Sequence, residues 1–373
     1  MTSLHLLPPL LHAAVHTSMA QEQTTTSPAS PAQAQPQPPS TQADPQLPEL
    51  AEQEPLQVED DVEDDGYAAS EASASILSSL NSSVFNYKYE NGRRYHAFRE
   101  GAYLVPNDDE EQDRMDLGHH IYSLLLGGEL YRAPIGKDIQ RVLDLGTGTG
   151  IWAMDFADQH PSAEVVGTDL SPIQPKWTPP NCTFEVDDLE QDWVYHNKFD
   201  YIHARELGGC VADDEKLFRQ AFEHLAPGGY FELQAVYPRF LSDDGTAHLA
   251  KDAQFWMKNI CEGAVKFGKP LDAAPGWLEK MKAAGFVDVK QEIRKFPMGG
   301  WAKDSTLKEI GRHALIQEQQ VIDSYTPGIF SRVLGWDEKE IQVLIAKVKN
   351  DLKNPAIHIY VPCYLIWGKK PEA

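Results

Sequence analysis

Short apolar runs alternate with amphipathic stretches from residue 141 onward. The first run, residues 141–145, ends in glycines and is followed by a helical pattern over residues 151–160. Runs of this length, bounded by turn residues, are typical of buried strands. The same pattern predicts strands over residues 164–168, 182–186, 199–203 and 229–235, and a helix over residues 213–225. Strands that alternate with helices predict a parallel sheet covered on both faces, and therefore an α/β fold.

The second half of the chain adds longer helices and two more strands. Apolar residues recur at helical spacing over residues 249–260 and 341–348, which predicts helices with core-facing stripes. Strands are predicted over residues 286–296, after a helix at 277–284, and over residues 358–368. Because a long and mostly helical segment separates these two strands, they do not form a tight hairpin, but they can pair at one edge of the sheet.

Residues 1–86 have a different composition. Gln, Pro, Thr, Ser and Ala dominate residues 21–55, and an acidic run follows at residues 59–65. Residues 1–87 contain no Lys or Arg and twelve Asp or Glu, so they carry −12 of the net charge of −23. Such a segment buries too little apolar surface to offset its ordering entropy. We therefore expect a disordered tail over residues 1–86, or a partner-binding arm, before one folded domain over residues 87–373.

Charge and cysteine content narrow the class of protein further. The acidic balance extends over both parts of the chain and leaves no basic surface for direct nucleic-acid binding or for an anionic membrane. No apolar stretch approaches the length of a membrane span. Four widely spaced cysteines form neither a zinc pattern nor a disulfide framework. We expect a reduced, intracellular protein, in the cytoplasm or the nucleus, although no basic nuclear import signal is visible.

The glycine-rich segment at residues 142–152 carries the clearest functional signal. A predicted strand runs through Asp144 into Gly146-Thr147-Gly148-Thr149-Gly150, and a helix follows. In this context a nucleotide can approach backbone N–H groups at a helix N-terminus. Ile151 occupies the third-glycine position of the dinucleotide fingerprint, which disfavours NAD. S-adenosylmethionine has no phosphate, so it fits better, and Asp144 can meet its ammonium group directly or through the loop.

Acidic residues follow the next two strands. Asp169 lies 23 residues after Gly146, where a Rossmann-like fold presents a carboxylate to ribose hydroxyls. Asp187 or Asp188 can accept a hydrogen bond from the adenine amino group, while Leu189 packs on the ring. All these residues come at the carboxyl ends of strands, where open α/β sheets bind ligands.

Several segments resemble the fungal LaeA-like S-adenosylmethionine-dependent methyltransferases, which are class I methyltransferases. The resemblance rests on residues 89–96, 106–116 with His119-His120, 167–175, 199–205 and, more weakly, 332–336. It implies a Rossmann-like fold with a seven-stranded, mostly parallel sheet and flanking helices. It also implies a role in fungal secondary metabolism, velvet-type regulatory partners for some members, and a cofactor site that includes Leu170. Thr147 stands where the best-known regulators have Cys, as it does in many paralogues.

Methyl transfer from a sulfonium is an in-line displacement, so the protein mainly aligns the reactants and excludes water. His203, at the end of the fourth strand, is the candidate for a general base or for a group that orients the acceptor; a packed histidine lining the cofactor site is the alternative. The acceptor is a small molecule or a protein. A regulator or scaffold that acts through protein partners, and an NAD-dependent oxidoreductase, are the rival functions.

The segment at residues 87–135 is expected to form a lid over the cofactor. Within it Asp116, His119 and His120 share a helical face, but this spacing is weak evidence for a metal, and we expect none. Arg114 can reach the cofactor carboxylate or pair with Glu110. Four aromatic residues, for each of which core packing is the default, are candidates for an acceptor pocket: Phe255, Trp256, Trp277 and Trp301.

Overall fold

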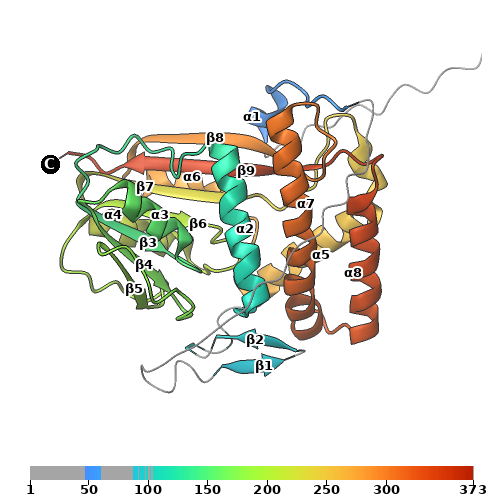
Figure 1. Cartoon of the computed structure of the whole chain (residues 1–373), viewed down its shortest axis with the longest axis horizontal. Coiled ribbons are helices and arrows are strands. Elements are labelled where there is room, and N and C mark those ends of the chain that lie inside the picture. The colour runs from blue at the N-terminus through green and yellow to red at the C-terminus, as the bar shows by residue number, and fades with distance from the viewer. Residues whose placement is uncertain are drawn as a thin grey trace, which may run out of the picture. The chain divides into compact units, whose positions relative to one another are not determined.

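The main structural element is a seven-stranded sheet (Figure 1). The computed structural model describes residues 47–59, 87–90, 92–96, 98–99, 101 and 104–372. The strands are β3 (Arg141–Leu145), β4 (Glu164–Asp169), β5 (Cys182–Val186), β6 (Phe199–Arg205), β7 (Leu225–Val236), β8 (Val287–Pro297) and β9 (Tyr360–Lys369), in the order β5-β4-β3-β6-β7-β9-β8. The first five are parallel, and β9 runs antiparallel to β7 and β8. The expected class I methyltransferase topology is confirmed, and so is the pairing of the last two strands at one edge.

Alternate side chains of the central strands enter two separate hydrophobic clusters. Val142 of β3 packs with α3 (Ile151–Gln159) on one face of the sheet. Leu143 and Leu145 pack in the cluster on the other face, with side chains of α4 (Asp214–His224) and α6 (Ala274–Ala283). This division follows from the two-residue periodicity of a strand, which turns successive side chains to opposite faces. The central strands are therefore covered by helices on both faces.

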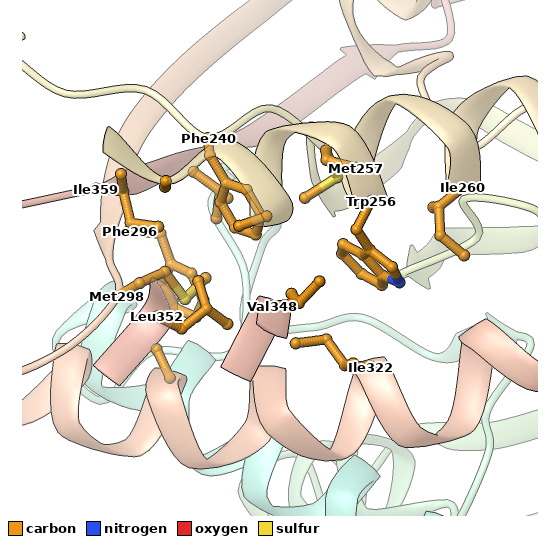
Figure 2. Close-up of a cluster of buried hydrophobic side chains, with 14 of the residues drawn as sticks. Phe240, Trp256, Met257, Ile260, Phe296, Met298, Ile322, Val348, Leu352 and Ile359 are labelled. Atoms are coloured by element: carbon orange, nitrogen blue, oxygen red, sulfur yellow. The ribbon is translucent and has the colours of Figure 1, made fainter. Parts of the chain in front are cut away.

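A helical layer lies beside the sheet and builds a third hydrophobic cluster (Figure 1). It contains α2 (Asp109–Leu126), η1 (Thr246–Leu249), α5 (Lys251–Phe267), α7 (Ser305–Thr326), the π-helical turn η2 (Pro327–Ser331) and α8 (Glu338–Lys353). Figure 2 shows Trp256 and Ile260 of α5 in one cluster with Ile322 of α7 and Val348 of α8. The Trp256 indole N–H also donates to Thr326 Oγ1 at 2.8 Å. These contacts fix the helical layer as one packed unit.

Side-chain caps set where α2, α7 and α8 begin. Asp108, Asp304 and Asp337 each accept a hydrogen bond from a backbone N–H of the first turn, and Asp337 forms a capping box with Glu340. Asp108 also pairs with Arg93 of β2 (Arg93–Tyr95), which forms a two-stranded sheet with β1 (Lys88–Glu90). The first turn of α2 is thereby joined to the segment that precedes it.

A buried carboxylate attaches the connection between α2 and β3 to the sheet. Glu232 of β7 is fully buried and accepts hydrogen bonds from the backbone N–H groups of Arg132 and Ala133. The hydroxyl of Tyr201 and the side-chain amide of Gln234 donate to the same carboxylate. Since a buried charge is costly unless its lone pairs are satisfied, these four donors make the site stable and hold the connection in place.

Residues 47–59 differ from the expected disordered tail. Leu47 and Leu50 are buried in the hydrophobic cluster that contains Trp301, and Val58 pairs with Ala302 through an isolated bridge. The backbone N–H of Leu56 donates a hydrogen bond to Asp243, and Glu59 forms an ion pair with Lys308. The short helix α1 (Pro48–Ala51) belongs to this segment. The burial of these two leucines is enough to hold the segment on the domain, although the residues around them are mostly polar.

The rest of the predicted tail, residues 1–46 and 60–86, lies outside the described residues, and the division of the chain at residue 86 stays a prediction for them. Among the described residues, no helix is both long and apolar enough to cross a membrane.

Replacing Leu50 by Ala tests whether residues 47–59 contribute to the stability of the domain. We expect the free energy of unfolding to fall by about 2–3 kcal/mol, as for other buried leucines. Gln57→Ala, at an exposed position of the same segment, is the matched control and should leave stability unchanged. Chemical denaturation of the full chain measures both, and equal midpoints for Leu50→Ala and the unsubstituted protein would contradict the packing.

Candidate functional site

One cavity of about 270 Å³ lies at the carboxyl ends of the parallel strands. Residues from the ends of β3, β4 and β6 and from the segment after β5 line one side of it, and residues of α2, α5 and α7 line the other. Parallel α/β sheets bind ligands at this edge because the connecting loops there can approach a ligand without interrupting the sheet. The site predicted from the glycine loop therefore coincides with the cavity.

The glycine loop needs glycine at three positions. Gly146, Gly148 and Gly150 have φ angles of 64°, 57° and 82°, in the left-handed region that other residues rarely adopt. A Cβ atom at Gly150 would lie 2.3 Å from Phe184 Cζ, and one at Gly148 would lie 2.9 Å from Met115 Sδ. The absence of side chains lets Phe184 of β5 and Met115 of α2 approach the loop closely. Gly150 is the N-cap residue of α3.

Asp144 connects the loop to the neighbouring strand. Its carboxylate accepts a hydrogen bond from Thr147 Oγ1 at 2.6 Å and lies 2.7 Å from His203 Nδ1. The His203 ring is stacked on Trp152, with 3.7 Å between ring centroids. His203 is fully buried, and within the described part of the chain its Nε2 has no hydrogen-bond partner. The structure therefore places this histidine on the cavity lining, bonded to Asp144.

Asp169 ends β4 with its carboxylate on the cavity wall. It accepts hydrogen bonds from the backbone N–H groups of Gly148 and Ser171, each at 2.9 Å. Burial raises the pKa of Asp169 to about 6, in opposition to those two hydrogen bonds, and the nearby Asp144 adds to the rise. The carboxyl group thus changes its charge within one to two pH units of neutrality.

The residues predicted to contact adenine lie on the same wall. Asp187, Asp188 and Leu189 all line the cavity, as does Leu170. Asp187 N–H donates to the carbonyl of Asp169 at 3.0 Å, which holds the end of β5 against the end of β4. Asp188 forms an ion pair with Arg99 at 3.5 Å and accepts a hydrogen bond from Glu190 N. All the predicted cofactor-site residues except Gly150 therefore line the cavity. Gly150 is the N-cap residue of α3.

Helix α2 lines the cavity, but its acid and histidines have separate partners. Asp116 accepts a hydrogen bond from Thr149 in the glycine loop at 2.6 Å. His119 contacts Asp155 and Arg205, and burial together with the Arg205 charge lowers its pKa to about 4. His120 packs edge-on against His313 of α7. Among the described residues no group of three or more His, Cys, Asp or Glu is placed to hold a metal.

Three acidic residues of the cavity were missed by the sequence analysis: Glu190, which pairs with Lys269, Glu206 and Glu318. Glu206 directly follows β6 with a φ of 57°, an unfavourable conformation for this residue type, and it accepts hydrogen bonds from Tyr122 and from Val236 N. Its position just after a predicted strand end was a usable signal. Glu318 of α7 also lines the cavity. Nothing in the local sequence distinguishes it from a solvated residue of an amphipathic helix.

Of the four aromatic residues considered for an acceptor pocket, Trp256 lines the cavity. Trp277 and Trp301 are buried in the cluster on one face of the sheet, where they pack as core. Phe255 is 45% exposed and contacts Trp336. Arg114, which was expected to reach the cofactor carboxylate or to pair with Glu110, lines the cavity and forms two hydrogen bonds with Glu111.

Comparisons with known proteins point to one class of enzyme. The family described as methyltransferase domain matches residues 90–291. The chain is 40% identical to the methyltransferase pytC of Aspergillus terreus over 298 residues, which cover 80% of this chain and 92% of the relative. It is 34% identical to the protein-methionine methyltransferase laeA of Emericella nidulans, over 80% of each chain. It is 32% identical to the secondary metabolism regulator LAE1 of Cochliobolus heterostrophus, over 76% of this chain and 94% of the relative.

The requirement for glycine at position 150 can be separated into backbone strain and steric overlap. Gly245 has nearly the same φ, 80°, but no atom lies within 4 Å of a Cβ placed there. Gly245→Ala should cost about 1–2 kcal/mol of stability from the left-handed backbone alone. Gly150→Ala should cost about 1–3 kcal/mol more because the methyl group overlaps the Phe184 ring. Thermal or chemical denaturation compares the two variants, and equal losses would contradict the close approach of β5.

Proposed function

Since the chain belongs to the fungal LaeA-like methyltransferase family, we propose that it binds S-adenosylmethionine in the glycine-loop half of the cavity. The single observation that carries this proposal is the convergence of the loop and Asp169 on one cavity wall. When bound, the cofactor supplies an electrophilic methyl group on a sulfonium centre.

The residues of this half of the cavity fit the parts of such a cofactor. Gly146 and Gly148 leave bare backbone where side chains would fill the space, so the methionine and ribose parts can pass close to the loop. Asp169 holds the ribose hydroxyls, because an ionised carboxylate accepts two hydrogen bonds in parallel. Asp187 or Asp188 accepts from the adenine amino group, and Leu170 and Leu189 provide apolar contact. Asp144 and Thr147 complete the end that faces the ammonium group.

His203 acts as a positioning residue in this proposal. His203 lines the cavity, but its side chain is fully buried and its Nε2 has no hydrogen-bond partner among the described residues. Its Nδ1 instead fixes the orientation of the Asp144 carboxylate, and the stacked Trp152 fixes the ring. This is the alternative that sequence analysis left open, and it assigns His203 to the cofactor side of the site rather than to proton transfer.

The biological role follows from the family. The protein acts as a methyltransferase of fungal secondary metabolism, on a small-molecule or protein acceptor. A second candidate is a regulatory protein that works through partners such as velvet-type proteins; it is supported by the likeness to the regulator of Cochliobolus heterostrophus. Turnover that depends on an acceptor separates the two, because a regulator that acts only through protein contacts does not need it.

Loss of cofactor binding on replacement of Asp169 tests the proposed site. Calorimetric titration of the full chain should show micromolar binding of S-adenosylmethionine and none of NAD. Asp169→Ala should abolish the binding because it removes the acceptor for both ribose hydroxyls. Asp158→Ala, on the exposed side of α3, is the matched control and should bind normally. A folded protein that binds NAD, or that binds neither ligand, would refute the proposal.

Cofactor binding should also depend on pH through Asp169. Because burial raises the pKa of this carboxyl to about 6, it is ionised above that pH and protonated below it. Only the ionised group accepts two hydrogen bonds from the ribose, so affinity should be lost as pH falls. Between pH 7 and pH 5 the ionised fraction drops by about tenfold, and affinity should drop similarly. Asp169→Asn should remove this part of the pH dependence; an unchanged slope in the variant would assign it to another group.

A further inference from the structure

We propose that the acceptor is a small, largely apolar molecule bound in the helical half of the cavity, where Glu318 accepts a hydrogen bond from its methyl-accepting hydroxyl or amine. This inference rests on the proposed function and specifies the second half of the same site.

One wall in the helical half of the cavity is apolar, while charged residues such as Arg114 and Glu318 line the same half. Trp256, Met257, Phe296 and Met298 line this wall, and all four are at most 5% exposed to solvent. They come from α5 and from the end of β8, and they belong to the cluster drawn in Figure 2. A wall of buried aromatic and thioether side chains suits an apolar ligand that enters completely. A side chain carried on a protein surface would have to bring its own backbone into this space.

Glu318 is the acidic residue of this half that has no internal partner. Within the described residues its carboxylate takes part in no hydrogen bond or ion pair, although it lines the cavity. The other acid, Glu206, already accepts from Tyr122 and Val236 N. Glu318 is partly exposed, so water can donate to its carboxylate while the cavity is empty, but a ligand that displaces this water must supply a donor in its place. The donor missing from the protein is therefore assigned to the acceptor molecule.

The surroundings of Glu318 support the same role. Burial raises its pKa to about 7, against the opposing charge of Arg114, and the charge of Glu206 adds to the rise. A carboxyl group with this pKa can hold a proton or accept a hydrogen bond near neutral pH. Arg114 is fixed in turn by Glu111, which accepts a hydrogen bond from Ser324 of α7. Gly118 of α2 leaves room for the side-chain amide of Gln317, the residue before Glu318 in α7.

The chemistry of the acceptor atom follows from this contact. A hydroxyl or an amine nitrogen carries a hydrogen that it can donate to Glu318, whereas a thioether sulfur carries none. If the contact forms, acceptors with such a hydrogen should bind more tightly than molecules of the same shape without one. This difference distinguishes the proposal from simple filling of an apolar cavity.

A matched pair of probes tests the contact: 2-naphthol, which carries a hydroxyl, and 2-methylnaphthalene, which has a methyl group in its place. Both are titrated into the full chain saturated with S-adenosylhomocysteine at about pH 8, where a carboxyl group of this pKa is ionised. We expect 2-naphthol to bind about 10- to 100-fold more tightly, the range of a hydrogen bond to a charged group. The preference should fall to about threefold or less in Glu318→Met, because the acceptor is gone.

Controls separate this inference from the proposed function. Glu309→Gln changes an exposed acid of the same helix and should keep the preference. Binding of S-adenosylhomocysteine is measured first in every variant; its absence from the native protein would refute the proposed cofactor site. If Glu318→Met does not fold, Glu318→Gln takes its place and should also reduce the preference, because a neutral amide is the weaker acceptor. Equal binding of the two probes, binding of neither, or a preference kept in both variants would overturn the inference.

Discussion

The site depends on the two hydrogen bonds of the Asp144 carboxylate. Asp144 is 3% exposed at the end of the central strand β3, so its charge has little water to solvate it. Thr147 from the loop and His203 from β6 satisfy it instead, and this joins the glycine loop to two adjacent strands. With the loop held in this way, the backbone N–H of Gly148 donates a hydrogen bond to the Asp169 carboxylate and fixes its position. The glycine loop thus owes its shape to a buried acid as much as to its glycines.

The two sides of the cavity are held in place by different kinds of interaction. Its sheet side is built on strand ends, which the parallel ladder holds rigidly. Its helical side comes from α2, α5 and α7, which are held to each other by side-chain packing and by polar contacts such as Glu111 with Ser324. In the proposed function, the first kind of wall holds the cofactor and the second kind faces the methyl acceptor.

Sequence patterns predicted the sheet side well and the helical side poorly. The strands were short apolar runs, and strand ends in a parallel sheet meet at one edge, so Asp144, Asp169 and Asp187 could be grouped without coordinates. Glu318 could not be grouped with them, because its position depends on how α7 packs against α2, which no local pattern encodes. The burial of Leu50 was missed for a related reason: two leucines in a polar segment carry no periodicity, and only the tertiary surface that receives them makes the burial favourable.

The attachment of the α2–β3 connection to Glu232 has a consequence for how such enzymes diverge. Two of the four donors to this carboxylate are main-chain N–H groups, of Arg132 and Ala133, and every residue except proline has such a group. The anchor therefore places little restriction on which side chains occupy those positions. Related chains can therefore differ in the side chains at positions 132 and 133, proline excepted, while the connection still docks at the same point on β7.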